Sequence, residues 1–173
     1  ACIFNTFGSE VSVFEFLPRI ISKADADISE ELTKYMEEDG INIYTDTSVS
    51  KISESGGIFS LVTKSGDSFE FDNIMLNTGV RGNTKDMNIE ASGVDIDDRG
   101  FVKVNEYLQT SNPNIWSIGD VVGKQLFTHM ALRESKTIVK NIFNHANIAL
   151  NFQNVPYAAF TNPPIGSVGK TEK

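Results

Sequence analysis

Two acidic residues stand where predicted strands end, and a carboxylate in that place can bind hydroxyl groups. Glu15 closes the apolar run VSVFE, and Asp120 follows Gly119 just past the run IWSI. Ligands of parallel sheets bind at the carboxyl ends of the strands. A helix predicted to begin near Thr128 would direct its partly positive N-terminus at the same crevice as Asp120. Asp120 is therefore a candidate ligand of a polyol chain, and a Gly-Asp turn without a ligand is the alternative.

Glu15 has the position of the acid in a dinucleotide-binding unit. There a Gly-rich turn follows the first strand, and an acid about 20 residues further on ends the second strand. The carboxylate accepts hydrogen bonds from both ribose hydroxyls and repels a 2′-phosphate, so Glu15 would favour NAD over NADP. The Gly-rich turn would precede Ala1, and a solvated strand end is the alternative for Glu15.

The hydrophobic pattern predicts an α/β fold that could position both acids. The chain opens with what look like the last turns of a helix ending at Gly8, and a second helix is expected at 27–40. Leu32, Tyr35 and Met36 share one face of that helix, which should pack on the sheet. Strands are expected at 11–16, 41–52, 57–64, 68–76, 100–106 and 115–118, with a hairpin or meander at 57–76.

Two details concern the helix faces and ends. Asp27 and Glu30 have the spacing of a capping box at the start of the helix 27–40. The helix from Thr128 is expected to carry Val139, Ile142, Phe143 and Ala146 on one apolar face.

Composition limits the function classes. The 173 residues are 40% hydrophobic and carry a net charge of −8 with a pI near 4.7. Nucleic acid and anionic membranes are therefore poor partners, since they require clustered Lys and Arg. Cys2 is the sole cysteine, and the sequence has no cluster of Cys and His with metal-ligand spacing, so no metal site is expected. These features favour a cytoplasmic protein.

Several motifs in one order resemble the pyridine nucleotide-disulfide oxidoreductase family. They are FGSEVSVFE (7–15), NTGVRGNT (77–84), the stretch 93–123 that ends in NIWSIGDVVG, LFTHMALRES (126–135) and VPYAAFTNPPIGSVGKTE (155–172). No short motif decides alone, but their order and spacing are specific. Within this family, an acid at the position of Glu15 fits the dihydrolipoamide dehydrogenases better. The Pro-Pro-Ile-Gly run instead resembles the glutathione reductases.

The resemblance implies cofactor contacts for particular residues. Asp120, beside Gly119, would hydrogen-bond the ribityl chain of FAD, and Glu15 would bind the ribose of NAD. The residues implied at the start of the flavin-facing helix are Thr128, His129, Met130 and Ala131. Gly79 and Arg81 would lie near the dinucleotide, in a loop where Gly82 replaces the family's usual Pro and is expected to loosen the chain.

The family's organisation implies an internal fragment with partial Rossmann-like FAD- and NAD(P)-binding domains and a β-meander. Residues 1–82 would end the NAD-binding domain, 83–150 would end the FAD-binding domain, and 151–173 would contribute the first strand of the dimerisation domain. The complete enzyme, a homodimer, would pass hydride from NADH to FAD, then electrons to a cysteine pair and a small-molecule disulfide. No catalytic residue is expected within the 173 residues, so the isolated chain would be inactive. A non-catalytic nucleotide-binding module and a structural fragment are the alternatives.

Overall fold

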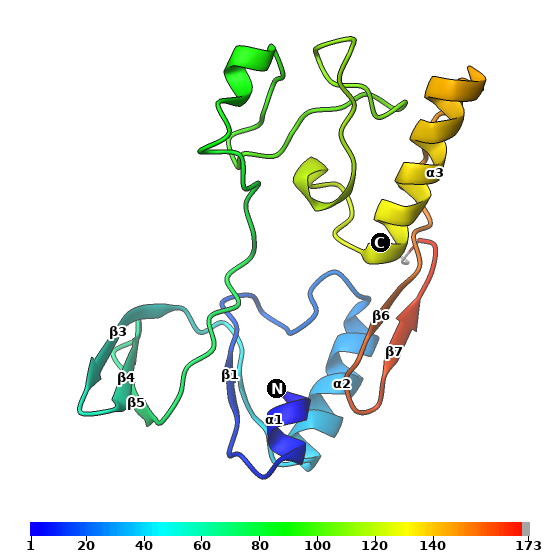
Figure 1. Ribbon diagram of the computed structural model, residues 1–173. Coiled ribbons are helices and arrows are strands. Elements are labelled where there is room, and N and C mark those ends of the chain that lie inside the picture. Colours follow the sequence, from blue (N-terminus) through cyan, green and yellow to red (C-terminus); the bar gives the residue numbers. More distant parts are fainter. Residues whose placement is uncertain (171–173) are drawn as a thin grey trace. The chain divides into compact units, whose positions relative to one another are not determined.

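The computed structural model describes residues 1–170 and has an α/β architecture of two compact units (Figure 1). The first contains residues 1–77 and the C-terminal segment from Ala158, and the second is Thr78–Tyr157. None of the helices within residues 1–170 has the length and apolar content that crossing a membrane requires. The expected domain boundaries at 82 and 150 stay a prediction.

The first unit is built on a short parallel strand pair. Strand β1 (Ser12–Phe14) pairs in parallel with β2 (Asn42–Tyr44), and helix α2 (Ala26–Glu38) connects them. Leu32 and Met36 of α2 are buried as predicted, in a core with Ile20 and Ile41. Tyr35, expected on the same face, is 43% exposed. The short helix α1 (Cys2–Thr6) precedes β1.

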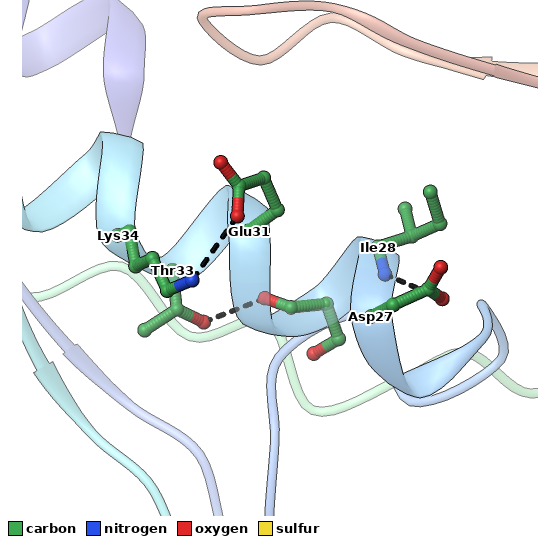
Figure 2. Close-up of polar contacts among 6 residues, drawn as sticks. Asp27, Ile28, Glu31, Thr33 and Lys34 are labelled. Carbon is green, nitrogen blue, oxygen red and sulfur yellow. Dashed lines mark hydrogen bonds and ion pairs between the residues drawn. The ribbon is translucent and has the colours of Figure 1, made fainter.

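Helix α2 begins differently from the sequence expectation. It starts at Ala26, so Asp27 lies inside the first turn and cannot be the N-cap of a capping box. The Asp27 carboxylate instead accepts a hydrogen bond of 2.8 Å from the N–H of its neighbour Ile28. Figure 2 shows this contact together with the exposed ion pair between Lys34 and Glu31. The sequence pattern therefore predicted the helix correctly, but the capping box that it assigned to Asp27 and Glu30 was wrong.

The predicted meander is present as a sheet of its own. Strands β3 (Val49–Ser55), β4 (Ile58–Thr63) and β5 (Ser68–Phe71) are antiparallel in the order β3-β4-β5. It does not extend the β1–β2 sheet by hydrogen bonding, but contacts it through aromatic rings. Phe14 stacks on Tyr44 with centroids 4.8 Å apart and meets the edge of Phe69 at 5.0 Å.

Two expected strands are shorter than the pattern suggested. The run 41–52 divides into β2 and β3 because Asp46 adopts a φ of +50°, which an extended strand cannot contain. Strand β5 ends at Phe71 and does not continue to 76, and Met75 and Leu76 are exposed. Apolar residues alone do not make a strand, because a strand also needs a partner for its backbone.

The second unit contains helices but no extended ladder among the described residues. The 3-10 helices η1 (Ile89–Ser92) and η2 (Gly119–Val122) precede α3 (Thr128–Asn144), which begins where the sequence predicted. The expected strands 100–106 and 115–118 are reduced to the single bridges Ile96–Val102 and Gln109–Trp116. Only one residue of each segment forms a bridge with a partner.

Helix α3 buries a different face from the one that its apolar residues suggested. Val139 and Phe143 are exposed, whereas Met130, Glu134 and Thr137 are buried. These three residues have the i, i+4, i+7 spacing of one helix face. The apolar residues therefore do not mark the buried face, which contains an acid, and Ala146 lies beyond the end of the helix at Asn144.

The C-terminal strands β6 (Tyr157–Ala159) and β7 (Ile165–Ser167) form a two-stranded sheet. Ile165 packs against the core around Leu32 and Met36. The side chain of Asn162 donates a hydrogen bond of 3.0 Å to the carboxylate of Asp39 at the end of α2. Both contacts attach this segment to the first unit.

Gly82 fixes its loop and does not loosen it, contrary to the expectation from its replacement of proline. A Cβ on Gly82 would lie 2.0 Å from the carbonyl oxygen of Gly100. The Gly82 N–H donates a bond of 2.9 Å to the carbonyl of Arg99, and the Thr84 hydroxyl donates one of 2.7 Å to that of Gly100. Only a residue with no side chain and with an N–H can make this approach.

Replacing Gly82 by Ala should therefore destabilise the second unit by about 1–3 kcal/mol, as overpacking does in a closed contact. Urea unfolding, followed by the fluorescence of Trp116, the sole tryptophan, measures this change in the unit concerned. The control is Asn83→Ala, an exposed position in the same loop, which should change stability by less than about 0.5 kcal/mol. Equal midpoints for the two variants would contradict the close contact.

Candidate functional site

Asp120 lies at a turn that is held against the first two turns of α3. Gly119 has a φ of +74°, and a Cβ built on it would be 3.7 Å from the Cβ of Ala131. The Gly119 N–H donates a hydrogen bond of 2.5 Å to Oε2 of Glu134. The Asp120 side chain is exposed. The structure thus brings together Gly119, Asp120 and the helix start that the sequence singled out.

The N-terminus of α3 is open to an acceptor. Its N-cap residue is Phe127, whose side chain has no oxygen to accept an N–H, and no side chain caps the helix there. The N–H groups of Met130 and Ala131 reach the Phe127 carbonyl at 3.0 and 3.1 Å. The N–H groups of Thr128 and His129 have no intrahelical acceptor, because these residues lie in the first turn. An anionic or electron-rich ligand would find donors there.

Aromatic rings flank this helix start. The rings of Phe127 and His129 stack with centroids 5.4 Å apart, and the rings of Phe127 and Tyr157 are nearly parallel at 6.2 Å. His129 is exposed, and His145 stands at the opposite end of α3 as its C-cap. The helix start therefore combines open backbone donors with flat apolar surfaces.

Glu134 is the residue of this site that the sequence patterns did not indicate. Its side chain is 1% exposed, although glutamate is rarely buried. Burial raises the pKa of Glu134, the hydrogen bond from Gly119 opposes that rise, and the charge of Asp120 adds to it. The available signal was its position four residues after Met130 and three before Thr137, on the face that the helix buries.

Glu15 lies, as predicted, at the carboxyl end of a parallel strand. Its N–H donates a bond of 2.9 Å to the Tyr44 carbonyl, which continues the pairing of β1 with β2. Its carboxylate Oε1 accepts the N–H of Leu17 at 2.9 Å. This bond orients the half-buried side chain, and a carboxylate still has capacity for further hydroxyl donors.

Gly79 and Arg81 occupy an exposed loop of the second unit. Gly79 has a φ of +90°, with nothing near the place of a Cβ, and Arg81 is exposed. The arginine that binds this loop is Arg99, whose guanidinium donates a bond of 2.7 Å to the Val80 carbonyl. Glu15 belongs to the other unit. Within residues 1–170, no group of three His, Cys, Asp or Glu residues has the arrangement of a metal site.

The raised pKa of Glu134 predicts a dependence of stability on pH. The folded state holds the Glu134 proton above the ordinary pKa of 4.5, so the unfolded state releases it first. The contribution of Glu134 to the free energy of unfolding is therefore fully present below about pH 4.5 and is lost as the pH rises through the pKa of the folded state. Between pH 4 and 8 the wild type should lose stability relative to Glu134→Gln, whose side chain does not titrate.

Thermal unfolding of both proteins at several pH values measures this difference. The control is Asn83→Ala, an exposed position of the same unit without a titrating side chain, whose offset in melting temperature from the wild type should stay constant with pH. If the difference in melting temperature between Glu134→Gln and the wild type also stays constant with pH, Glu134 has the same pKa in the folded and unfolded states, and the prediction is wrong.

The comparisons with known proteins agree on one family. Residues 1–150 match the sequence model of the pyridine nucleotide-disulphide oxidoreductases. The chain is 34% identical over 169 residues to a dihydrolipoyl dehydrogenase of Chlamydia pneumoniae, covering 98% of this chain and 36% of that protein. It is 37% identical over 174 residues to a chloroplastic/mitochondrial glutathione reductase of Pisum sativum, covering 100% of this chain and 32% of that one. A mercuric reductase of Staphylococcus aureus is 33% identical, with coverage of 99% and 32%.

Solved structures support the same fold. The Cu(II) complex of the HOCl-induced flavoprotein disulfide reductase RclA from Escherichia coli has a TM-score of 0.91 at 26% identity, over 99% of this chain and 40% of that one. LpdA from Mycobacterium tuberculosis has the same fold, with a TM-score of 0.91 at 18% identity and coverage of 99% and 37%. The chain spans about a third of the length of the curated relatives. These matches confirm the resemblance seen in the motifs and the partial Rossmann-like fold, and the chain belongs to the pyridine nucleotide-disulphide oxidoreductase family.

Proposed function

We propose that these residues are part of a longer FAD-containing, NADH-linked disulfide oxidoreductase, most like dihydrolipoamide dehydrogenase. The observation that supports it best is the placement of the exposed Asp120 against the uncapped start of α3. Relatives that share the family are named as disulfide reductases or dehydrogenases of this class, and one of them as a flavoprotein. A small-molecule disulfide is the proposed substrate of the complete enzyme, a homodimer in the cytoplasm.

The donor set at Asp120 fits a flavin nucleotide. The carboxylate of Asp120 would accept hydrogen bonds from the ribityl hydroxyls, beside the backbone of Gly119. The first N–H groups of α3, on Thr128 and His129, would face the electron-rich edge of the ring. Met130 and Ala131 would act through the aligned dipoles of the first turn, since their own N–H groups bond to Phe127.

The carboxylate of Glu15, an acceptor for hydroxyl groups, fits the ribose of NAD. The bond from Leu17 holds one carboxylate oxygen and thereby the side chain at the strand end. Its negative charge would repel a 2′-phosphate, which disfavours NADP. Gly79 and Arg81 are proposed to lie beside the bound dinucleotide. Residues 1–82, 83–150 and 151–173 would contribute to the NAD-binding, FAD-binding and dimerisation domains, respectively.

The residues of this chain bind and orient but perform no thiol chemistry. Bound FAD would supply the transfer of hydride equivalents from NADH to a cysteine pair. The 173 residues contain one cysteine, Cys2, and no Gly-x-Gly-x-x-Gly turn for a pyrophosphate. Both would have to come from other parts of the complete enzyme. A nucleotide-binding module without catalysis is the alternative, and it predicts binding with no turnover.

The complete enzyme should prefer NADH to NADPH because of Glu15. In Glu15→Gln the preference, expressed as the ratio of kcat/KM values, should fall because the repulsion of the 2′-phosphate is lost. The matched control is Glu10→Gln, an exposed acid in the same unit, which should leave the ratio unchanged. Equal efficiency of the wild type with both nucleotides would contradict the assignment.

The isolated chain should retain no stoichiometric FAD and oxidise no NADH. It lacks the donors for the pyrophosphate, and each lost charge-assisted hydrogen bond costs roughly 1.5–3 kcal/mol of binding. The chain is mixed with excess FAD and desalted, flavin absorbance is recorded, and NADH oxidation is followed with oxidised glutathione. Bound flavin near one per chain, or turnover above that of free flavin, would overturn this expectation.

A further inference from the structure

We propose that Glu134 is the positioning residue of Asp120: by accepting the N–H of Gly119, it fixes the turn that presents Asp120 at the start of α3. The functional meaning of this rests on the proposed function, in which Asp120 contacts the ribityl chain. Gly119, Asp120 and Glu134 all lie in the second unit. Glu134 itself is buried and acts through the backbone of Gly119.

The Gly119–Glu134 bond joins two elements at the point where the site is built. Glu134 lies in the second turn of α3, and Gly119 precedes Asp120 directly. The N–H of Gly119 meets Oε2 at 2.5 Å, a short separation for an N–H donor and a carboxylate oxygen. The acceptor therefore fixes the distance between the turn and the helix start, which are the two groups that a flavin would contact together.

The opposite end of the turn is also fixed. The N–H of Gly123 donates to the Asp120 carbonyl at 3.0 Å, and a Cβ on Gly123 would lie 2.5 Å from the ring of Phe101. The N–H of Val102 donates to the carbonyl of Val121 at 2.8 Å. Asp120 thus lies between two anchored points, and Glu134 provides the anchor that comes from α3.

A general packing role explains this residue poorly. An apolar side chain would fill the same buried place without the desolvation of an acid, which raises the pKa of Glu134. The charge of Asp120, the neighbouring acid, raises it further. The carboxylate of Glu134 lies where it accepts the N–H beside Asp120. A side chain with an acceptor oxygen but no charge, such as Gln, should therefore preserve the function of Glu134.

Amide NMR on the purified chain tests this directly. In Glu134→Ala the exchange rate of the Gly119 amide should rise at least about tenfold, because its acceptor is gone. The order parameter of the Asp120 amide should fall from about 0.85, the value of rigid backbone, towards about 0.6. Glu134→Gln should keep both values near those of the wild type, which is a rescue by the conservative variant.

The matched control is Thr137→Val, which alters a buried polar residue on the same face of α3. The Thr137 hydroxyl bonds to Arg133 within the helix, so its loss should destabilise the unit without moving the Gly119 and Asp120 amides. If Thr137→Val raises exchange at Gly119 as much as Glu134→Ala, or if Glu134→Gln fails to rescue, the proposal is wrong. Unchanged exchange in Glu134→Ala would overturn it as well.

If Glu134→Ala does not fold, a titration of the wild-type protein provides the test. The chemical shift of the Gly119 amide proton should then follow the titration of the Glu134 carboxyl, with the same midpoint as the side-chain carbon signals of Glu134. A Gly119 shift independent of that titration would overturn the proposal. None of these measurements uses flavin, so failure to bind FAD would count against the proposed function alone.

Discussion

Close approach of backbone to backbone holds the second unit together, and the site depends on it. The described part of this unit has only isolated bridges in place of strand ladders, so other contacts must fix its chain. Gly82 and Gly100 meet without room for a side chain, and Gly123 lies under the ring of Phe101. These contacts lead from the loop of Gly79 to the turn of Asp120 through one continuous set of neighbours.

Side chains complete the fixation by binding backbone N–H groups. Asp97 accepts the N–H groups of Arg99 and Phe101, and Asn105 accepts those of Tyr107 and Gln109. Short polar side chains of this kind give backbone groups the partners that a sheet would otherwise provide. The Glu134 carboxylate extends the same device to the turn that contains Asp120. The second unit therefore positions its candidate cofactor-binding residues mainly by loops and one helix.

The first unit positions its acid in a different way. A parallel strand pair has the core around Leu32 and Met36 on one side and the rings of β5 on the other, so its side chains alternate between two apolar environments. Val13 packs towards the helix, and the next residue, Phe14, meets the meander. Glu15 then follows at the strand end, where its N–H donates to the Tyr44 carbonyl and its carboxylate accepts the N–H of Leu17.

The sequence by itself determined the family, the α/β class, the meander and the starts of β1 and α3, because these follow from local period, turn residues and motif order. Tertiary structure decided what depends on distant partners. It divided 41–52 at Asp46, reduced 100–106 and 115–118 to single bridges, and turned α3 so that Glu134 is buried while Val139 is exposed. Periodicity identifies an apolar stripe but not the neighbour that covers it, and no local pattern shows that an acid's partner is an N–H fifteen residues earlier.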